Sequence, residues 1–140
     1  MLVRVLYVSR AEGPQTTTVT ASILETARRR NREHGIGGVL CQGQGLYLQV
    51  LEGERDAVNR LYARIIVDRR HHDLVLLQLE EIGARRFAGW SMALVDLSER
   101  DAMVQLKHPE FDPYSASGAD AMKLVDALLA AGHPIEQPAS

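Results

Sequence analysis

The sequence predicts an α+β fold in which two helices cover one face of a mixed β-sheet. The first observation is the order of its apolar patterns, which reads β-α-β-β-α-β followed by one further strand. The second is a length of 140 residues with 46% apolar side chains and a formal charge of -2, which suits one compact domain. This element order is the split β-α-β arrangement of the ferredoxin-like class.

The first three strands and the first helix follow from short patterns. The segment VRVLYVS is apolar and β-branched, which predicts a strand. Thr16 to Thr18 can cap a helix that runs to about His34, where HGIGG supplies the glycine stop of a helix C-terminus. The segment GVLCQGQGLYLQVLEG then reads as a hairpin of two strands that turns around Gly43 to Gly45.

A second helix and two more strands complete the predicted core. The segment ERDAVNRLYARIIVD has the apolar spacing of an amphipathic helix and should end near Asp68. DLVLLQLEEI predicts a strand, and WSMALVD predicts a last strand after a bend at Ala88 and Gly89. We therefore expect residues 1–97 to form the core domain.

The remaining residues, 98–140, differ in character and predict a helical extension. Ser98 can cap a short helix to Leu106, KHPEFDPYSASG reads as a loop, and ADAMKLVDALLAA reads as a second helix. The two helices would form a hairpin that covers the other face of the sheet or a dimer or partner interface. The final HPIEQPAS should be a frayed end.

Composition argues against several classes of function. There is no apolar run of about 18 residues and no signal-peptide layout, so we expect a cytoplasmic protein without a membrane span. The lone Cys41 argues against a disulfide or thiolate metal site, and no two histidines have the i, i+4 spacing of a metal pair. A pI near 6.2 gives no global attraction to nucleic acid, and the helix dipole accounts for the RRRNR cluster.

Three polar side chains fall on faces that should be buried. Gln49 shares a strand face with Tyr47 and Leu51, and Asn31 ends an otherwise apolar i, i+4 stripe on the first helix. Tyr7 continues the apolar face of the first strand. Buried amides and hydroxyls need hydrogen-bond partners, so either neighbouring protein groups satisfy these three side chains or a ligand does.

Two further pairs have both a structural and a functional interpretation. Arg64 and Asp68 are spaced as an exposed i, i+4 ion pair, which spacing alone favours, although the helix dipole disfavours a carboxylate at that end. Trp90 and Met92 fall on the same face of the predicted last strand. They read either as ordinary core or as residues that flank an aromatic ligand.

Together these segments resemble the BLUF family of flavin-binding blue-light sensors, in particular its short stand-alone members. The resemblance covers about residues 1–97 and joins several separated motifs: LYVSRA, the helix before HGIGGVL, YLQVLEG, ARIIVDRRH and WSM. Many members carry threonine or another side chain where this chain has Gly37. We expect that difference to loosen the start of the second strand without affecting the site.

The resemblance implies a role for individual residues. Tyr7 matches the photochemical tyrosine, Gln49 the glutamine that bridges to the flavin, and Asn31 the asparagine at the carbonyl edge of the ring. Trp90 and Met92 match positions implicated in signalling. The resemblance further implies that three residues line the ring pocket or hold its polar edge: Ile23, Arg64 and Asp68.

The implied function is a photoreceptor that binds FAD, with FMN or riboflavin as alternatives, and passes its signal to an unidentified protein partner or to a second copy in a homodimer. Electron and proton transfer from Tyr7 would rearrange Gln49 and give a reversible red shift. Two enzyme classes of similar layout stay open from the residues alone, a flavin reductase and an acylphosphatase-like hydrolase. Neither a nicotinamide fingerprint nor a glycine-rich phosphate loop is present in the sequence.

Overall fold

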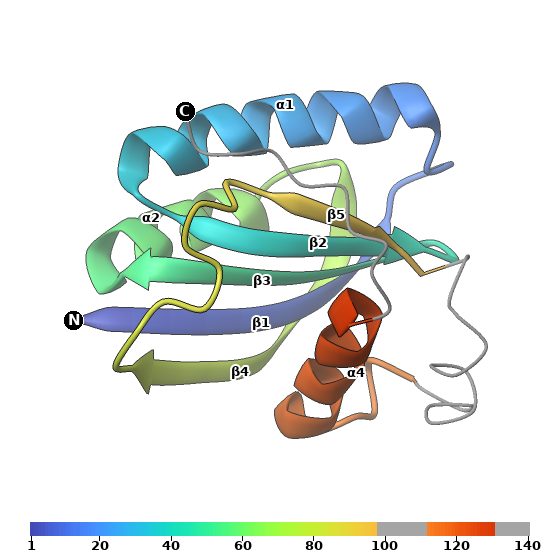
Figure 1. The fold of residues 1–140 in the computed structure, drawn as a ribbon. Coiled ribbons are helices and arrows are strands. Elements are labelled where there is room, and N and C mark those ends of the chain that lie inside the picture. Colours follow the sequence, from blue (N-terminus) through green and yellow to red (C-terminus); the bar gives the residue numbers. More distant parts are fainter. Residues whose placement is uncertain (98–111, 131–140) are drawn as a thin grey trace.

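A computed structural model of the chain describes residues 1–97 and 112–130 (Figure 1). These residues form a five-stranded sheet in the order β4-β1-β3-β2-β5 with helices on both faces. The predicted β-α-β-β-α-β-β order is confirmed. The elements are β1 Leu2–Ala11, α1 Thr17–His34, β2 Gly37–Gly43, β3 Leu46–Glu54, α2 Arg55–Ile66, β4 His71–Ile82, β5 Ala93–Asp96 and α4 Gly118–Ala130.

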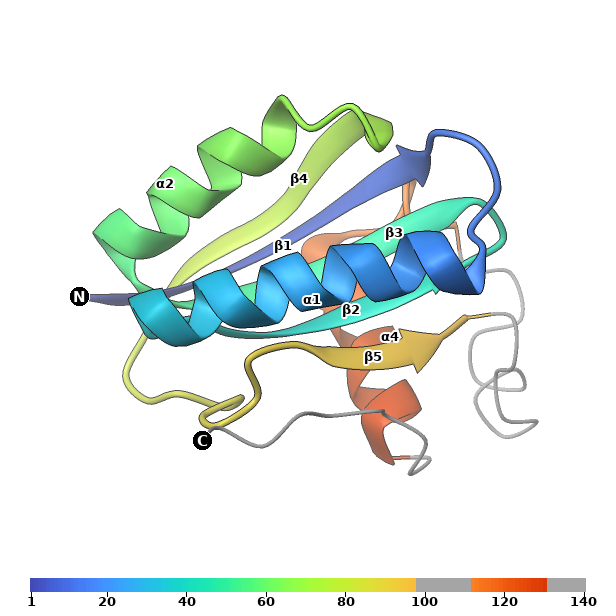
Figure 2. The same ribbon diagram turned by 90° about the horizontal axis from the view of Figure 1, so that it is seen from above.

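The sheet is mixed because its last strand joins in parallel. Strands β1, β2, β3 and β4 pair antiparallel, whereas β5 runs parallel to β2. Helices α1 and α2 lie side by side on one face of the sheet, and α4 lies on the other (Figures 1 and 2). Among the described residues, no helix has the length and apolar character needed to cross a bilayer.

Strand alternation divides the core into two layers. On β1, Leu6 and Val8 face α4, while Val5 and Tyr7 face α1 and α2. On β3 the face opposite α4 carries Tyr47 and Leu51, so Gln49 between them also faces the two helices, as the period of two predicts. Tyr7 and Gln49 therefore lie in the layer beneath α1 and α2.

The predicted boundaries of α1 are confirmed by its caps. The Thr16 side chain accepts a hydrogen bond of 3.2 Å from the Val19 backbone N–H. At the other end Gly35 adopts a left-handed conformation with φ of 63°, which ends the helix after His34. These limits fix Asn31 in the last turn of α1 with its side chain fully buried.

The C-terminal extension is represented by one helix. The predicted helix over residues 119–131 corresponds to α4, whose buried face comprises Ala121, Leu124, Val125 and Leu128. A side chain at Gly118 would place its Cβ 2.5 Å from the Leu77 carbonyl oxygen, so glycine allows the helix to start close to β4. The predicted short helix from Ser98 to Leu106 and the predicted frayed end lie outside the described residues, so the hairpin is not seen.

The last strand corrects one prediction. Strand β5 begins at Ala93, after the residues expected to start it, and Trp90 and Met92 lie in the irregular segment before it. Without regular alternation the two side chains do not share a face. Met92 packs in the layer with Tyr7, whereas Trp90 packs against the layer that contains α4.

Gly37 also differs from expectation, because it permits a close contact rather than loosening β2. The residue is buried, and a Cβ there would lie 2.5 Å from the carbonyl oxygen of Phe87. The segment that leads to Trp90 therefore passes directly over the start of β2. A hydrogen bond of 2.9 Å from the Gly38 N–H to the Trp90 carbonyl fixes this crossing.

Candidate functional site

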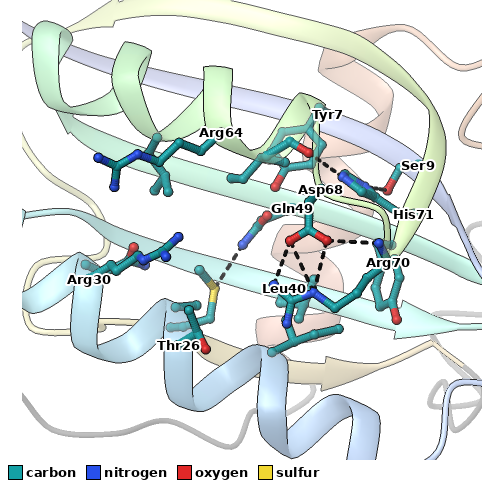
Figure 3. A pocket seen from close by; sticks show the side chains of 17 residues that line it. Tyr7, Ser9, Thr26, Arg30, Leu40, Gln49, Arg64, Asp68, Arg70 and His71 are labelled. Carbon is teal, nitrogen blue, oxygen red and sulfur yellow. Dashed lines mark hydrogen bonds and ion pairs between the residues drawn. The ribbon is translucent and has the colours of Figure 1, made fainter.

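A pocket opens between α1, α2 and the sheet (Figure 3). Its volume is about 720 Å³, including space open to solvent. It contains seven of the eight residues singled out in the sequence. These are Tyr7, Ile23, Asn31, Gln49, Arg64, Asp68 and Met92. Trp90 is not among the lining residues.

Tyr7 of β1 lines the sheet side of the pocket. Strand register places it directly opposite Gln49, so the two side chains project from neighbouring strands on the same face. Its ring packs against Tyr62 of α2, with centroids 5.6 Å apart. Burial first, and then the neighbouring Tyr62 and Asp68, raise the pKa of the Tyr7 hydroxyl well above its ordinary value. The phenol therefore stays protonated at neutral pH.

Gln49 has a weak partner in the pocket. Its Nε2 donates to the Sδ of Met92 at 3.5 Å, and a thioether is a poor hydrogen-bond acceptor. The side chain is 8% exposed, so little water can compensate. The amide therefore keeps unused hydrogen-bonding capacity.

Asn31 is satisfied at one end only. Its Nδ2 donates to the Ser91 carbonyl at 2.5 Å, which fastens the last turn of α1 to the segment before β5. Its Oδ1 is buried without a partner among the described residues. Leaving a buried acceptor unpaired costs about 1 to 3 kcal/mol, so a ligand that donates a hydrogen bond to this oxygen would be bound favourably.

Arg64 and Asp68 both line the pocket but do not form the ion pair that their spacing favours. Helix α2 ends at Ile66, so Asp68 no longer follows helical geometry. Its carboxylate pairs instead with Arg70, whose Nη2 lies 2.6 Å from Oδ2. Hydrogen bonds from the Arg70 side chain lower the pKa of the Asp68 carboxyl. Arg64 has no ion-pair partner within the described part of the chain.

Sequence reasoning missed the pocket residues that follow Asp68. Arg70 and His71 both line the pocket, and neither was singled out in the sequence. The Nδ1 of His71 lies 2.7 Å from the Ser9 hydroxyl, and its Nε2 contacts the Ile65 carbonyl, so the ring is held between β1 and α2. The available signal was their position two and three residues after Asp68, a candidate site residue. The other lining residues are Ser9, Thr26, Ala27, Arg30, Leu40, Tyr47, Leu61 and Ile65.

Two hydrogen bonds connect α1 to the backbone beside Gln49. One is the bond from Asn31 to the Ser91 carbonyl, and the other runs from Nε of Arg28 to the Met92 carbonyl at 3.1 Å. The side chain of Met92 points back to Gln49. Met92, which contacts Gln49, therefore belongs to a segment that is also hydrogen-bonded to α1. A change in the Gln49 side chain would act directly on that segment.

Comparison with known proteins identifies the family. Residues 2–93 match BLUF, described as sensors of blue-light using FAD. The chain is 37% identical over 92 residues to the photoactivated adenylate cyclase subunit beta of Euglena longa, covering 65% of this chain and 11% of that protein. It is 32% identical over 107 residues to the blue light- and temperature-regulated antirepressor BluF of Escherichia coli (strain K12), covering 75% of this chain and 27% of that protein.

The fold leads to the same family. The dark-state structure of BlrB, a BLUF protein, is 30% identical and superposes with a TM-score of 0.78, covering 94% of this chain and 97% of that one. The chain thus spans only a small part of the two curated relatives but nearly the full length of BlrB. The match over residues 2–93, together with the shared fold, shows that the chain belongs to the BLUF family of blue-light sensors, whose domains bind a flavin.

Proposed function

We propose that this chain senses blue light through a hydrogen-bond change at Gln49, with Tyr7 as the electron and proton donor. The observation that carries the proposal is the set of unmet polar groups in one apolar pocket. Asn31 Oδ1 has no partner among the described residues, and the Gln49 amide has only a thioether. A polar ligand in the pocket would satisfy both.

The residues of the pocket fit a flavin ring. The polar edge of isoalloxazine presents carbonyl oxygens and one N–H group. Asn31 Oδ1 can accept from an N–H, while the Gln49 amide and the Arg64 guanidinium can donate to carbonyl oxygens. Ile23 and Leu61 supply apolar contact for the ring from α1 and α2. We therefore assign ring binding to Tyr7, Ile23, Asn31, Gln49, Arg64 and Asp68, with FAD as the cofactor and FMN and riboflavin as alternatives that share the ring.

The chemistry proceeds through the Tyr7 and Gln49 side chains. A bound flavin absorbs blue light, and its excited ring is a strong one-electron oxidant. Tyr7 is protonated and buried, so it can release an electron and pass its hydroxyl proton to the Gln49 amide on the opposing strand. When both return, the amide can remain flipped or tautomerised, because its two ends differ as donor and acceptor. Because the electron and the proton return to Tyr7, a bound flavin would keep its oxidation state, and the altered hydrogen bond of Gln49 would give a small red shift that reverts in the dark.

The small free energy of this hydrogen-bond change limits the conformational response that it can drive. One rearranged hydrogen bond contributes about 1 kcal/mol, whereas moving a two-state element from 1:99 to 99:1 needs about 5.5 kcal/mol. The output element must therefore lie close to balance in the dark. We assign this element to the Trp90–Met92 segment and the extension over residues 98–140, with 1–97 as the sensing core.

Several contacts support this route. Met92 touches Gln49 on the α1 side, and Trp90 packs with Phe87 at a centroid distance of 5.8 Å on the α4 side. Strand β5 continues from this segment, and its Val95 packs in the same layer as α4. The receiver beyond α4 would be a noncovalent protein partner or a second copy of the chain. No observation in the described residues favours the reductase or hydrolase alternatives.

Replacement of Tyr7 by phenylalanine tests the function. The variant keeps the ring and loses only the hydroxyl, so flavin binding should persist while the red shift disappears under blue light. The matched control is Tyr114→Phe, because that hydroxyl bonds the Asp73 carbonyl at 2.8 Å outside the pocket. Absorbance difference spectra give the readout. A normal photocycle in the Tyr7 variant, or purified wild type that cannot bind flavin, would contradict the proposal.

A further inference from the structure

The loop between β4 and β5 crosses the whole sheet, because these two strands form its edges (Figure 1). On the way it passes over the start of β2, with Phe87 packed in the layer of α4 and Met92 in the layer beneath α1 and α2. We call residues 87–92 the crossing segment. Its C-terminal end contacts Gln49 of β3 through Met92. The way in which its N-terminal end is held therefore decides how a change at Gln49 moves the residues between.

A buried carboxylate holds the N-terminal end of the crossing segment. The side chain of Glu52 is fully buried, and its Oε1 accepts a hydrogen bond from the Phe87 backbone N–H. Glu52 lies three residues after Gln49 on β3, so the two side chains project from opposite faces of the sheet. Strand β3 therefore contacts both ends of the crossing segment, one end on each face of the sheet.

A row of cross-strand contacts fixes the Glu52 side chain. The register places four residues side by side on neighbouring strands, namely Glu80 of β4, Arg4 of β1, Glu52 of β3 and Gly37 of β2. Arg4 Nη2 donates to Glu52 Oε2 at 3.0 Å, and Arg4 Nη1 donates to Glu80 Oε1 at 3.2 Å. The two oxygens of Glu52 thus have different partners, Arg4 for one and the Phe87 N–H for the other.

Backbone hydrogen bonds extend this attachment along the crossing segment. The Phe87 carbonyl accepts from the Trp90 N–H at 3.0 Å, and the Trp90 carbonyl accepts from the Gly38 N–H at 2.9 Å. The Trp90 ring also packs on the Phe87 ring, with centroids 5.8 Å apart. The part from Phe87 to Trp90 is therefore bound to β2 and β3, and Met92 lies beyond the last of these bonds.

The carboxylate of Glu52 is not accounted for by flavin binding or by a large gain in stability. It does not line the flavin pocket. A buried ion pair is a weak source of stability, because taking both charges out of water offsets most of their attraction. What the carboxylate adds over an apolar side chain is one directed, charge-assisted hydrogen bond to the Phe87 N–H, and such bonds are about twice as strong as neutral ones.

We propose that Glu52 is a positioning residue that fixes Phe87 as the pivot of the crossing segment. The inference rests on the proposed function and adds the contact that gives the signal its direction. When the Gln49 side chain rearranges, it displaces Met92. Phe87 stays on Glu52, so the residues between turn about this point instead of shifting with Met92. Trp90 then changes its packing against the layer that contains α4.

The test uses Trp90 as the probe, because the chain contains one tryptophan. The chain is labelled with fluorotryptophan and loaded with FAD, and fluorine NMR spectra are recorded in the dark and under blue light. Amide hydrogen exchange at Phe87 is measured by NMR in the same two states, the flavin red shift by absorbance, and Tm by thermal melts.

Two matched substitutions separate the hydrogen bond from the ion pairs of Arg4. Glu52→Gln keeps the length of the side chain and one carbonyl oxygen for the Phe87 N–H but removes the charge. The control is Glu80→Gln, because Glu80 accepts from the same arginine. In the described part of the chain, no hydrogen bond joins Glu80 to the crossing segment.

In wild type, light should change the Trp90 signal while Phe87 exchange stays as in the dark. In Glu52→Gln, the Phe87 amide should exchange about fivefold faster in the dark, because a neutral acceptor replaces a charged one. The light-induced change in the Trp90 signal should shrink about twofold or more, since fewer molecules hold the pivot. The flavin red shift should persist, because Glu52 does not line the pocket. Glu80→Gln should leave all of these readouts near wild type.

The outcomes separate this inference from the proposed function. Faster Phe87 exchange in illuminated wild type overturns the pivot, and this measurement does not depend on the folding of any variant. A Glu52 variant with a lower Tm and a Trp90 response of wild-type size would give Glu52 a purely structural role and also overturn it. Equal losses in the Glu52 and Glu80 variants would do so too, by assigning the effect to Arg4. A normal red shift in any of these cases leaves the proposed photochemistry standing, whereas wild type without a red shift would overturn both.

Discussion

The Asn31 side-chain oxygen, which has no partner in residues 1–97 and 112–130, gives the sharpest test of whether the pocket is built for a ligand. Replacing Asn31 by leucine removes the orphan Oδ1, which relieves about 1 to 3 kcal/mol, and leaves the Ser91 carbonyl unpaired, which costs a similar amount. The two effects nearly cancel, so the apo protein should change in stability by about 1 kcal/mol or less in either direction. That corresponds to a shift of about 4 °C or less in Tm for a chain of this size.

Flavin binding should respond very differently to the same substitution. The loss of hydrogen bonds to the ring edge should weaken flavin binding about tenfold or more. The control is Thr20→Val on the same helix, since the buried Thr20 hydroxyl already donates to Gln42 Oε1 at 2.8 Å. This control should destabilise the apo protein by about 1 kcal/mol and leave flavin affinity unchanged. Thermal melts and flavin titrations measure both quantities, and an Asn31 variant that unfolds easily yet binds flavin normally would refute the reasoning.

Three further predictions concern single contacts. Met92→Leu conserves side-chain volume, so the free energy of unfolding should fall by less than about 1.5 kcal/mol. The loss of the sulfur acceptor for Gln49 should change the dark-recovery rate, followed by absorbance, by up to about fivefold. An unchanged rate would argue against the contact. Arg70 lowers the pKa of Asp68, so the pair stabilises the fold above the unfolded-state pKa and loses this contribution as the pH falls through the folded-state pKa. Asp68→Asn should lower Tm by about 1 to 3 °C at pH 7, with the difference shrinking from about pH 5 to pH 3; a constant difference would contradict this. Blue light should alter hydrogen exchange in α4, and Trp90→Leu should reduce that change without affecting flavin binding; an unaltered α4 in illuminated wild type would exclude the proposed route.

Periodicity accounts for the part of the site that could be predicted. A period of two places Tyr7 and Gln49 on faces of known polarity, and the i, i+4 rule turns Asn31 toward the core. The element order then makes β1 and β3 neighbours beneath α1, so these side chains meet. All three are buried in the structure. The periodicity of the strands and of the helix was therefore enough to predict that these three polar side chains are buried.

Prediction failed where a regular element stops. The i, i+4 rule applied to Arg64 and Asp68 assumes a helix through both residues, but α2 ends at Ile66. Beyond that point the chain turns, and Asp68 reaches Arg70 two residues later, with a further bond from the Arg70 backbone N–H at 2.9 Å. Spacing in the sequence does not reveal the helix end, because Val67 carries none of the usual stop signals.

The failure at Trp90 and Met92 has the same origin and a functional consequence. A strand through both residues would have put their side chains on one face, and the signal that we propose to start at Gln49 would then have stayed in the layer beneath α1. The chain instead crosses over the start of β2, where Gly37 leaves no room for a Cβ below the Phe87 carbonyl. Met92 consequently touches the pocket while Trp90, two residues earlier, packs on the side of α4. An irregular segment of three residues can therefore connect the two faces of a sheet that is otherwise closed between them.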